Sequence, residues 1–167
     1  MRFIIIAIIA VLLDALTKSG LVYMLTGTVP LTGDAFQILP YPYMIARITD
    51  WFNLVFTWNP GTSFSLFRNL GESAPIIIVV LTGLIILFLL HQLIFRASKT
   101  TEKYALALIV GGALGNLIDR LRFGAVADFI DWHIGDWHWP AFNLADVFIC
   151  AGVAVYILSW IIQRNKK

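Results

Sequence analysis

The uncharged stretch over residues 73–95 limits the fold of this chain more than any other feature of its sequence. No Asp, Glu, Lys or Arg lies between Glu72 and Arg96. The hydrocarbon core of a bilayer is about 30 Å thick, and an α-helix crosses it with about 20 mainly apolar residues. Pro75 lies in the first turn of such a helix, where its missing N–H costs little. The stretch therefore predicts a helix that spans a membrane.

Three further segments have the length and composition of spanning helices. They cover residues 3–24, 104–121 and 144–162. Hydrophobic residues make up 59% of the 167 residues, compared with about 45–50% in soluble domains. The first segment begins like a signal peptide, but no small-residue cleavage site follows it and Asp14 and Lys18 interrupt its far end, so we expect it to be retained. The predicted fold class is a membrane all-α bundle of four transmembrane helices with a small β element, in a single domain over residues 1–167.

Two segments outside the spans, residues 26–70 and 122–143, have a different composition. They hold Gly, Pro, Thr and aromatic residues with short alternating stretches such as FNLVFTW, which indicate short strands or irregular structure on or just above the bilayer. Basic residues collect at the other ends of the spans, as they do in cytoplasmic flanks: Arg2, Arg96, Lys99, Lys103, Arg164, Lys166 and Lys167. We therefore expect cytoplasmic termini and place the two aromatic segments on the opposite, periplasmic side.

Several classes of function and site are excluded by what the chain lacks. The net charge of +2 and the absence of a Lys/Arg block argue against a nucleic-acid partner. Cys150 is the only cysteine, so no internal disulfide forms. The chain has neither HExxH nor GxSxG, and its histidines do not combine zinc-ligand spacing with a cysteine pair. We therefore expect no metal and no cofactor, and we interpret His133 and His138 as interfacial aromatic residues.

Charged residues inside the first span need a physical reason, because a charge in hydrocarbon is costly. Asp14 and Lys18 are four residues apart and share a helix face, so pairing accounts for both. They either anchor the first helix or contribute to function, and their spacing favours neither. Ser63 or Ser65 together with Lys18 would make a Ser-Lys dyad, which the composition allows and no spacing supports.

The third span carries Gly111 and Gly115, a GxxxG pattern that lets another helix approach closely. Asn116, Asp119 and Arg120 follow on one face of the same helix. Because buried charges are normally paired and hydrogen-bonded, we expect these three side chains to point into the bundle and bond to one another or to the loop backbone. A structural network is favoured over a catalytic one here.

Two motifs lie next to the spans. In NPGTSF, Asn59 precedes a Pro-Gly turn that includes Gly61, and the motif is either a capped turn or a loop that offers its amide and backbone N–H groups to a peptide. In FNLAD, Asn143 suits the N-cap of the fourth span, which places Asp146 at the third helical position, where the helix dipole favours a carboxylate.

Asp146 has a second interpretation, because Asp128 lies 18 residues earlier and can meet it at the end of the third span. Two carboxylates a few ångströms apart share one proton, since both cannot ionise cheaply. One then acts as a base and the other as an acid, and together they can activate a water molecule for attack on a peptide carbonyl.

Five motifs occur in an order and spacing that resemble lipoprotein signal peptidase, also called signal peptidase II. They are LDALTK (13–18), NPGTSF (59–64), GGALGNLIDR (111–120), VADFID (126–131) and FNLAD (142–146). The resemblance covers nearly the whole chain. It implies a bacterial inner-membrane aspartyl endopeptidase that removes the signal peptide from diacylglyceryl-modified prolipoproteins, cleaving before the lipidated cysteine. It also implies four membrane helices with a periplasmic β-cradle and a second, aromatic periplasmic loop.

The resemblance implies roles for individual residues by their motif positions. Asp128 and Asp146 match the catalytic pair. Seven residues are expected to support the site or bind substrate: Asn59, Gly61, Asn116, Arg120, Asn143, Asp14 and Lys18. Three are expected to have a structural role: Asp119, Gly111 and Gly115. The implied partners are a lipid-modified prolipoprotein and membrane lipid, and we expect a monomer.

The chain departs from the family pattern in three places. Ala15 stands where the family usually has Gln, Thr62 and Ser63 stand where it commonly has alanines, and the stretch 33–51 is longer than usual. Two other classes remain open. A transporter or proton channel predicts charges throughout the membrane depth, whereas here most gather near one face. An assembly subunit predicts that Asp→Asn changes lower stability without accumulation of a substrate.

Overall fold

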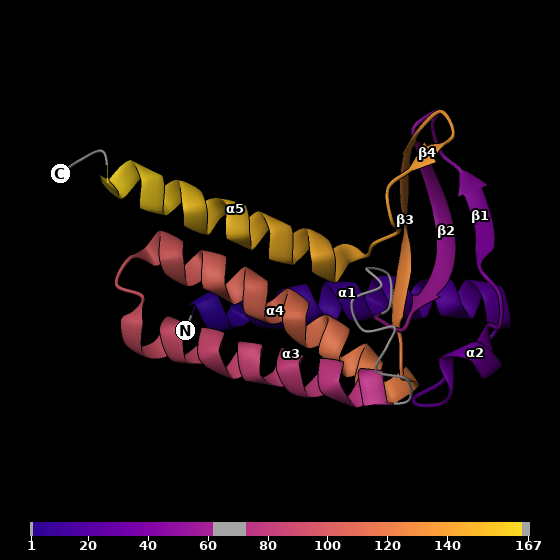
Figure 1. Cartoon of the computed structure of the whole chain (residues 1–167), viewed down its shortest axis with the longest axis horizontal. Coiled ribbons are helices and arrows are strands. Elements are labelled where there is room, and N and C mark those ends of the chain that lie inside the picture. The colour runs from indigo at the N-terminus through magenta and orange to yellow at the C-terminus, as the bar shows by residue number, and fades with distance from the viewer. Residues whose placement is uncertain (1, 62–72, 165–167) are drawn as a thin grey trace. The chain divides into compact units, whose positions relative to one another are not determined.

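The computed structural model describes residues 2–61 and 73–164, and the helices and strands in these ranges follow one another as shown in Figure 1. They are α1 (Arg2–Thr26), α2 (Ala35–Ile38), β1 (Tyr43–Arg47), β2 (Phe52–Asn59), α3 (Ala74–His91), the π-helical turn η2 (Gln92–Arg96), α4 (Thr100–Phe123), β3 (Val126–Ile134), β4 (Trp137–His138) and α5 (Leu144–Arg164). The chain divides into two compact units. A helical unit lies within residues 1–15, 81–116 and 144–167, and a sheet unit within 16–80 and 117–143.

Four helices of the described residues are long and apolar enough to cross a membrane: α1, α3 together with η2, α4, and α5. They occur at the four segments that the sequence predicts as spans. The α4 window is the most buried, at 56% against 11–22% for the others, and has the lowest mean hydropathy, 1.3. A helix covered by its neighbours needs less apolar surface toward lipid, so α4 can carry the polar residues of the GGALGNLIDR motif. The single membrane domain expected above stays a prediction.

Small residues bring the helices of the helical unit close together. A Cβ added at Gly111 of α4 would lie 2.8 Å from the Cβ of Ala10 in α1. A Cβ at Gly112 would collide with the carbonyl oxygen of Ala145 in α5, and one at Gly152 of α5 would lie 2.6 Å from the carbonyl oxygen of Ala105 in α4. The glycines thus allow both α1 and α5 to approach the backbone of α4.

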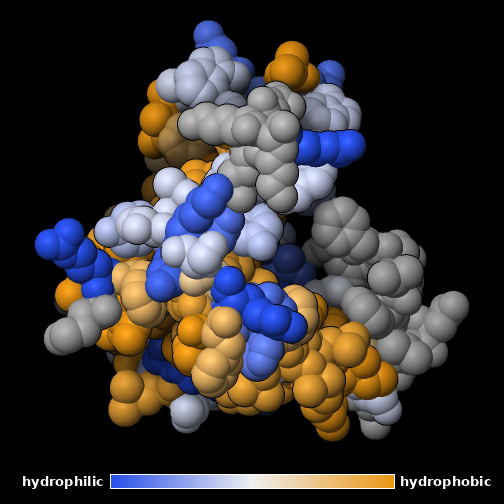
Figure 2. Space-filling model, turned by 90° about the vertical axis from the view of Figure 1, so that its left-hand side faces the viewer, coloured by the Kyte–Doolittle hydropathy of each residue, from blue (hydrophilic) through white to orange (hydrophobic). Residues whose placement is uncertain are grey.

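Basic side chains gather at one end of the helical unit. The start of α4 lies beside the end of α5, because the hydroxyls of Thr101 and Ser159 are 3.2 Å apart. It also lies beside the start of α1, because Lys103 Nζ is 5.8 Å from the ring centroid of Phe3. Figure 2 faces this end and shows hydrophilic (blue) side chains gathered there, with hydrophobic (orange) ones around them.

The sheet unit is built on an antiparallel sheet of four strands in the order β1-β2-β3-β4, counted over the described residues. Strand β2 is the predicted alternating stretch, and it buries Phe56 fully and Trp58 to 8% exposure. A bulge between Leu54 and Thr57 shifts the register, so that Thr57 lies opposite Asp128 of β3. The small β element predicted from the sequence is therefore present.

The long stretch over residues 33–51 supplies two elements of the sheet unit. Asp34 accepts a hydrogen bond from the Phe36 N–H at 2.9 Å and caps α2. Strand β1 then pairs with β2 and forms one edge of the sheet. Residues 33–51 thus supply an edge strand of the sheet.

The aromatic segment after Asp131, expected as a loop, forms the β3–β4 hairpin. Ile134 pairs with Trp137 across a two-residue turn, and Gly135 there has φ of 59°. Such turns need a residue that tolerates positive φ, and Gly followed by Asp is a common choice. The hairpin exposes Trp132, Ile134, Trp137 and Trp139.

Candidate active site

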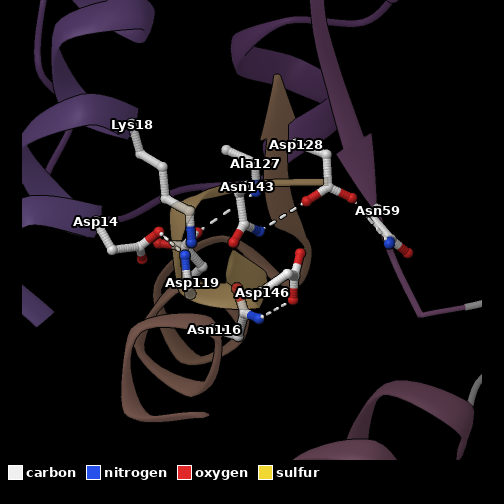
Figure 3. Close-up of polar contacts among 10 residues, drawn as sticks. Asp14, Lys18, Asn59, Asn116, Asp119, Ala127, Asp128, Asn143 and Asp146 are labelled. Carbon is white, nitrogen blue, oxygen red and sulfur yellow. Dashed lines mark hydrogen bonds and ion pairs between the residues drawn. The ribbon is translucent and has the colours of Figure 1, made fainter. Parts of the chain in front are cut away.

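Asp128 in β3 is held by two asparagine side chains of the sheet unit. Its carboxylate accepts hydrogen bonds from Asn59 Nδ2 at 2.9 Å and from Asn143 Nδ2 at 2.7 Å, one on each oxygen. Figure 3 shows the two amides on either side of this carboxylate. Asp128 is only 2% exposed and Asn143 is fully buried. Because both oxygens have a fixed donor, the carboxyl group is fixed in one orientation.

The Pro-Gly turn sets the orientation of the Asn59 amide. Asn59 Oδ1 accepts a hydrogen bond from the Gly61 N–H at 2.8 Å, so its NH₂ group is the part that faces Asp128. Gly61 has φ of 90°, and a Cβ there would lie 2.5 Å from Ile78 Cδ1. The positive φ favours glycine here, and a Cβ would also require the end of the Ile78 side chain to move. The rest of the motif, with Thr62, Ser63 and the Ser65 of the alternative dyad, lies outside the described residues.

A buried ion pair fixes the start of β3. Lys18 Nζ of α1 lies 2.9 Å from Asp119 Oδ2 of α4, and the two side chains are 5% and 8% exposed. The same Asp119 oxygen accepts a hydrogen bond from the Ala127 N–H at 3.4 Å. Since Ala127 directly precedes Asp128, this pair positions the backbone that carries the aspartate. The Ala127 N–H is a contact that motif reasoning did not identify.

In the helical unit, Asp14 caps a helix other than its own. Its Oδ1 accepts a hydrogen bond from the Ala145 N–H at 2.9 Å, and the side chain is almost fully buried. Helix α5 begins at Leu144, as predicted, and its first N–H groups have no acceptor within the helix. Gly115 makes room for this contact, because a Cβ there would lie 2.5 Å from Asp14 Oδ2.

Asp146 lies in the first turn of α5, at the third helical position that the sequence predicts. Its Oδ1 accepts a hydrogen bond from Asn116 Nδ2 of α4 at 2.8 Å, and the residue is half-buried. Two of the carboxylates, Asp128 and Asp146, are thus each oriented by asparagine amides.

The polar residues of α1 and α4 make contacts with other elements. Asn116 donates to Asp146 on another helix, whereas Asp119 pairs with Lys18. Lys18 and Asp14 each bind a group on a different element. Arg120 is half-buried in the last turns of α4.

Comparisons with known proteins agree with this arrangement of motifs. Residues 6–162 match the family model described as Signal peptidase (SPase) II. The lipoprotein signal peptidase of Anaplasma phagocytophilum (strain HZ) is 49% identical over 119 residues, which cover 71% of this chain and 75% of that protein. The lipoprotein signal peptidase of Aeromonas hydrophila subsp. hydrophila is 36% identical over 170 residues, which cover 100% of this chain and 92% of that one.

A solved structure described as a bacterial membrane enzyme, determined by the in meso method at 2.3 Å resolution, has a similar fold. Its TM-score is 0.76 at 26% sequence identity, and the match covers 99% of this chain and 91% of the other. The family match spans most of the chain, and four of its helices can cross a membrane. The chain therefore belongs to the signal peptidase II family and is a multi-pass membrane protease of lipoprotein precursors.

Proposed function

We propose that Asp128 and Asp146 form the catalytic pair of an aspartic endopeptidase that cleaves diacylglyceryl-modified prolipoproteins before the lipidated cysteine. The observation that carries the proposal is which kind of side chain donates a hydrogen bond to each aspartate. Asp128 and Asp146 accept from asparagine amides, which orient a carboxylate without adding charge. Asp119 instead pairs with a lysine, and Asp14 caps a helix. The latter two acids are scaffold.

The covalent chain supports a common site for the two aspartates. Asn143, which donates to Asp128, lies three residues before Asp146 in the sequence. Consecutive Cα atoms are about 3.8 Å apart, so Asn143 and Asp146 are close along the chain. This continuity accounts for the short spacing of the FNLAD motif.

The pair would act on a water molecule without a covalent intermediate. One carboxylate takes a proton from water while the water oxygen bonds to the scissile carbonyl carbon, and the other carboxyl group gives its proton to the carbonyl oxygen. In the second step the C–N bond breaks and the leaving nitrogen takes the proton that the base received from water. One hydroxyl group of the tetrahedral intermediate returns its proton to the other carboxylate as the carbonyl re-forms, which restores the starting protonation of the pair. The two groups share one proton at the start.

The family indicates the class of substrate, and the basic residues at the helix ends indicate the orientation of the protein in the membrane. The relatives are named lipoprotein signal peptidases, and we infer the same class of substrate, with its acyl chains in the bilayer. The basic residues at one end of the helical unit, Arg96, Lys99, Lys103 and Arg164, support a cytoplasmic position for that end. Both termini would then be cytoplasmic and the site periplasmic in the bacterial inner membrane. We propose a monomer.

The test uses detergent-solubilised protein and a diacylglyceryl-modified prolipoprotein, with cleavage followed as a size shift. Asp128→Asn and Asp146→Asn should each lower the rate by at least about 10²–10⁴-fold, the usual contribution of a general acid or base. Asp50→Asn is the matched control, because its side chain is 93% exposed and outside the site. Near-normal cleavage by either site variant would exclude the pair. Equal cleavage of a precursor without the lipid would exclude the substrate class.

A further inference from the structure

A second polar cluster lies on the sheet, built by strand alternation and register. Asp131 and His133 are two apart in β3, so their side chains leave the same face. His138 of β4 lies directly opposite His133, and Asn53 of β2 lies directly opposite Asp131. Neighbours across a sheet share a face. The four side chains therefore form one patch, which we name the histidine cluster.

The cluster's donor atoms converge on one carboxylate. His138 Nδ1 lies 2.7 Å from Asp131 Oδ1, and His133 Nδ1 lies 3.8 Å from Asp131 Oδ2. Each of Asp131, His133 and His138 offers one possible ligand atom, and these three atoms lie within 4.8 Å of one another. The two imidazole rings are stacked, with centroids 4.9 Å apart and planes 13° from parallel. Two imidazole nitrogens and a carboxylate oxygen thus lie close together.

Asn53 completes the surroundings of these atoms. Its Nδ2 donates to Asp131 Oδ2 at 2.8 Å and lies 3.4 Å from His133 Nδ1. A donor at that place favours the His133 tautomer with a lone pair on Nδ1, which is the form that binds a metal. Carboxylates that bind metals are commonly fixed by such a second hydrogen bond.

Burial and charge in the cluster suit a cation. Asp131 and His133 are 7% and 8% exposed, whereas the His138 side chain is 49% exposed and leaves an entry path from solvent. Burial raises the pKa of Asp131. Hydrogen bonds from His138 and Asn53 and the positive charge of the nearby imidazoles lower this pKa by a larger amount, so it lies below its usual value.

We propose that Asp131, His133 and His138 bind one divalent transition-metal ion, with Zn²⁺ as the best-fitting class. Zinc accepts imidazole nitrogen and carboxylate oxygen as ligands, and three protein ligands leave a fourth position for water. On binding, His138 gives up the proton on Nδ1 and the metal takes its place. The lack of a cysteine pair, which argued against a zinc site in the sequence, does not count against this set of ligands.

The metal holds the hairpin and takes no part in cleavage. The three ligand residues are distinct from Asp128 and from the two asparagines that hold it. Strand β4 has two residues and pairs with β3 at only two positions among the described residues. A bridge from β3 to His138 would fasten this short strand and fix the exposed tryptophans beside it.

The test is a metal titration of the full-length, detergent-solubilised protein, purified without a polyhistidine tag and stripped with a chelator. Zn²⁺ is added in competition with a chromophoric chelator, and Co²⁺ is used to read the coordination from its visible absorption. We expect one Zn²⁺ per chain. His138→Gln should weaken binding at least about tenfold, and it is the first variant to test because a half-exposed residue can change without loss of the fold.

His91→Gln is the matched control, because His91 lies at the end of α3 and its ring contacts Phe95 in a tilted arrangement instead. It should bind Zn²⁺ as the unchanged protein does. Asp131→Asn should also weaken Zn²⁺ binding, and this loss does not involve a histidine. The proposal is overturned if the unchanged protein binds no stoichiometric Zn²⁺, or if His138→Gln and Asp131→Asn bind as tightly as His91→Gln.

Discussion

Lys18 of α1 and Asp119 of α4 form an ion pair of 2.9 Å in which both side chains are more than nine-tenths buried. Taking two charges out of water costs several kcal/mol each, and only close pairing with further hydrogen bonds offsets this. The hydrogen bond from the Ala127 N–H to Asp119 provides part of that compensation. It also couples the pair to Asp128, the next residue in β3. A contact that looks purely structural therefore sets the position of a proposed catalytic group.

The first prediction concerns this pair. Lys18→Met should lower the free energy of unfolding by about 3–5 kcal/mol, because it leaves the buried Asp119 without its cation. The control is Arg47→Ala, which breaks the exposed Arg47–Asp50 pair and should cost at most about 1 kcal/mol. Thermal unfolding in one detergent compares the two variants. A similar loss for both would show that burial does not decide the strength of the Lys18–Asp119 pair.

The second prediction separates positioning of Asp128 from folding. Asn59→Ala removes one amide donor and should lower kcat about 10–100-fold with a smaller change in KM, because a misoriented catalytic group affects the transition state most. Asn59→Asp, nearly identical in shape, should lower kcat more, because it puts a second carboxylate beside Asp128. Equal kcat values for Asn59→Asp and the unchanged protein would contradict the proposed role. Unfolding temperatures of both variants test whether the fold is retained.

The sequence predicts the spans well because length and apolar composition alone decide whether a helix can cross a bilayer. It also places Asp146 correctly, since a cap at Asn143 fixes the helical position three residues later. It does not identify the partner of Lys18. Spacing reports only neighbours on the same helix, such as Asp14, whereas the contact with Asp119 depends on how α1 and α4 pack.

The histidine cluster shows a second limit of sequence reasoning. Its signal is present: Asp131 and His133 alternate on a strand, and a Gly-Asp turn brings His138 back opposite His133. Alternation places Asp131 and His133 on one face, but the return of His138 to that face depends on the register of the hairpin. Strand β1 is harder to predict, since an edge strand of five residues whose partner is set by the sheet has little pattern of its own.

The third prediction tests the close approach of α4 and α5. Gly112→Ala should destabilise the protein by about 1–3 kcal/mol, because the new methyl group collides with the backbone of Ala145 and overpacking strains the interface. Gly83→Ala in α3 is the matched control, since a Cβ there meets no atom within 4 Å among the described residues. It should be neutral or stabilise by up to about 1 kcal/mol through helix propensity. Thermal unfolding distinguishes them, and equal destabilisation would contradict the packing argument.

The last prediction concerns Asp14, which acts on Asp146 through the start of α5. Asp14→Ala removes the acceptor for the Ala145 N–H and should cost about 0.5–2 kcal/mol, the usual effect of losing a cap. Asp14→Asn keeps an oxygen that can accept this bond and should retain most of the stability. Because Asp146 lies one residue beyond Ala145, a frayed first turn also displaces its carboxylate, so Asp14→Ala should lower kcat more than Asp14→Asn does. Unfolding temperature and cleavage rate are measured on the same samples, with Asp50→Asn as reference. If Asp14→Asn loses as much stability and activity as Asp14→Ala, the charge of Asp14, and not its hydrogen bond to α5, is what the protein requires.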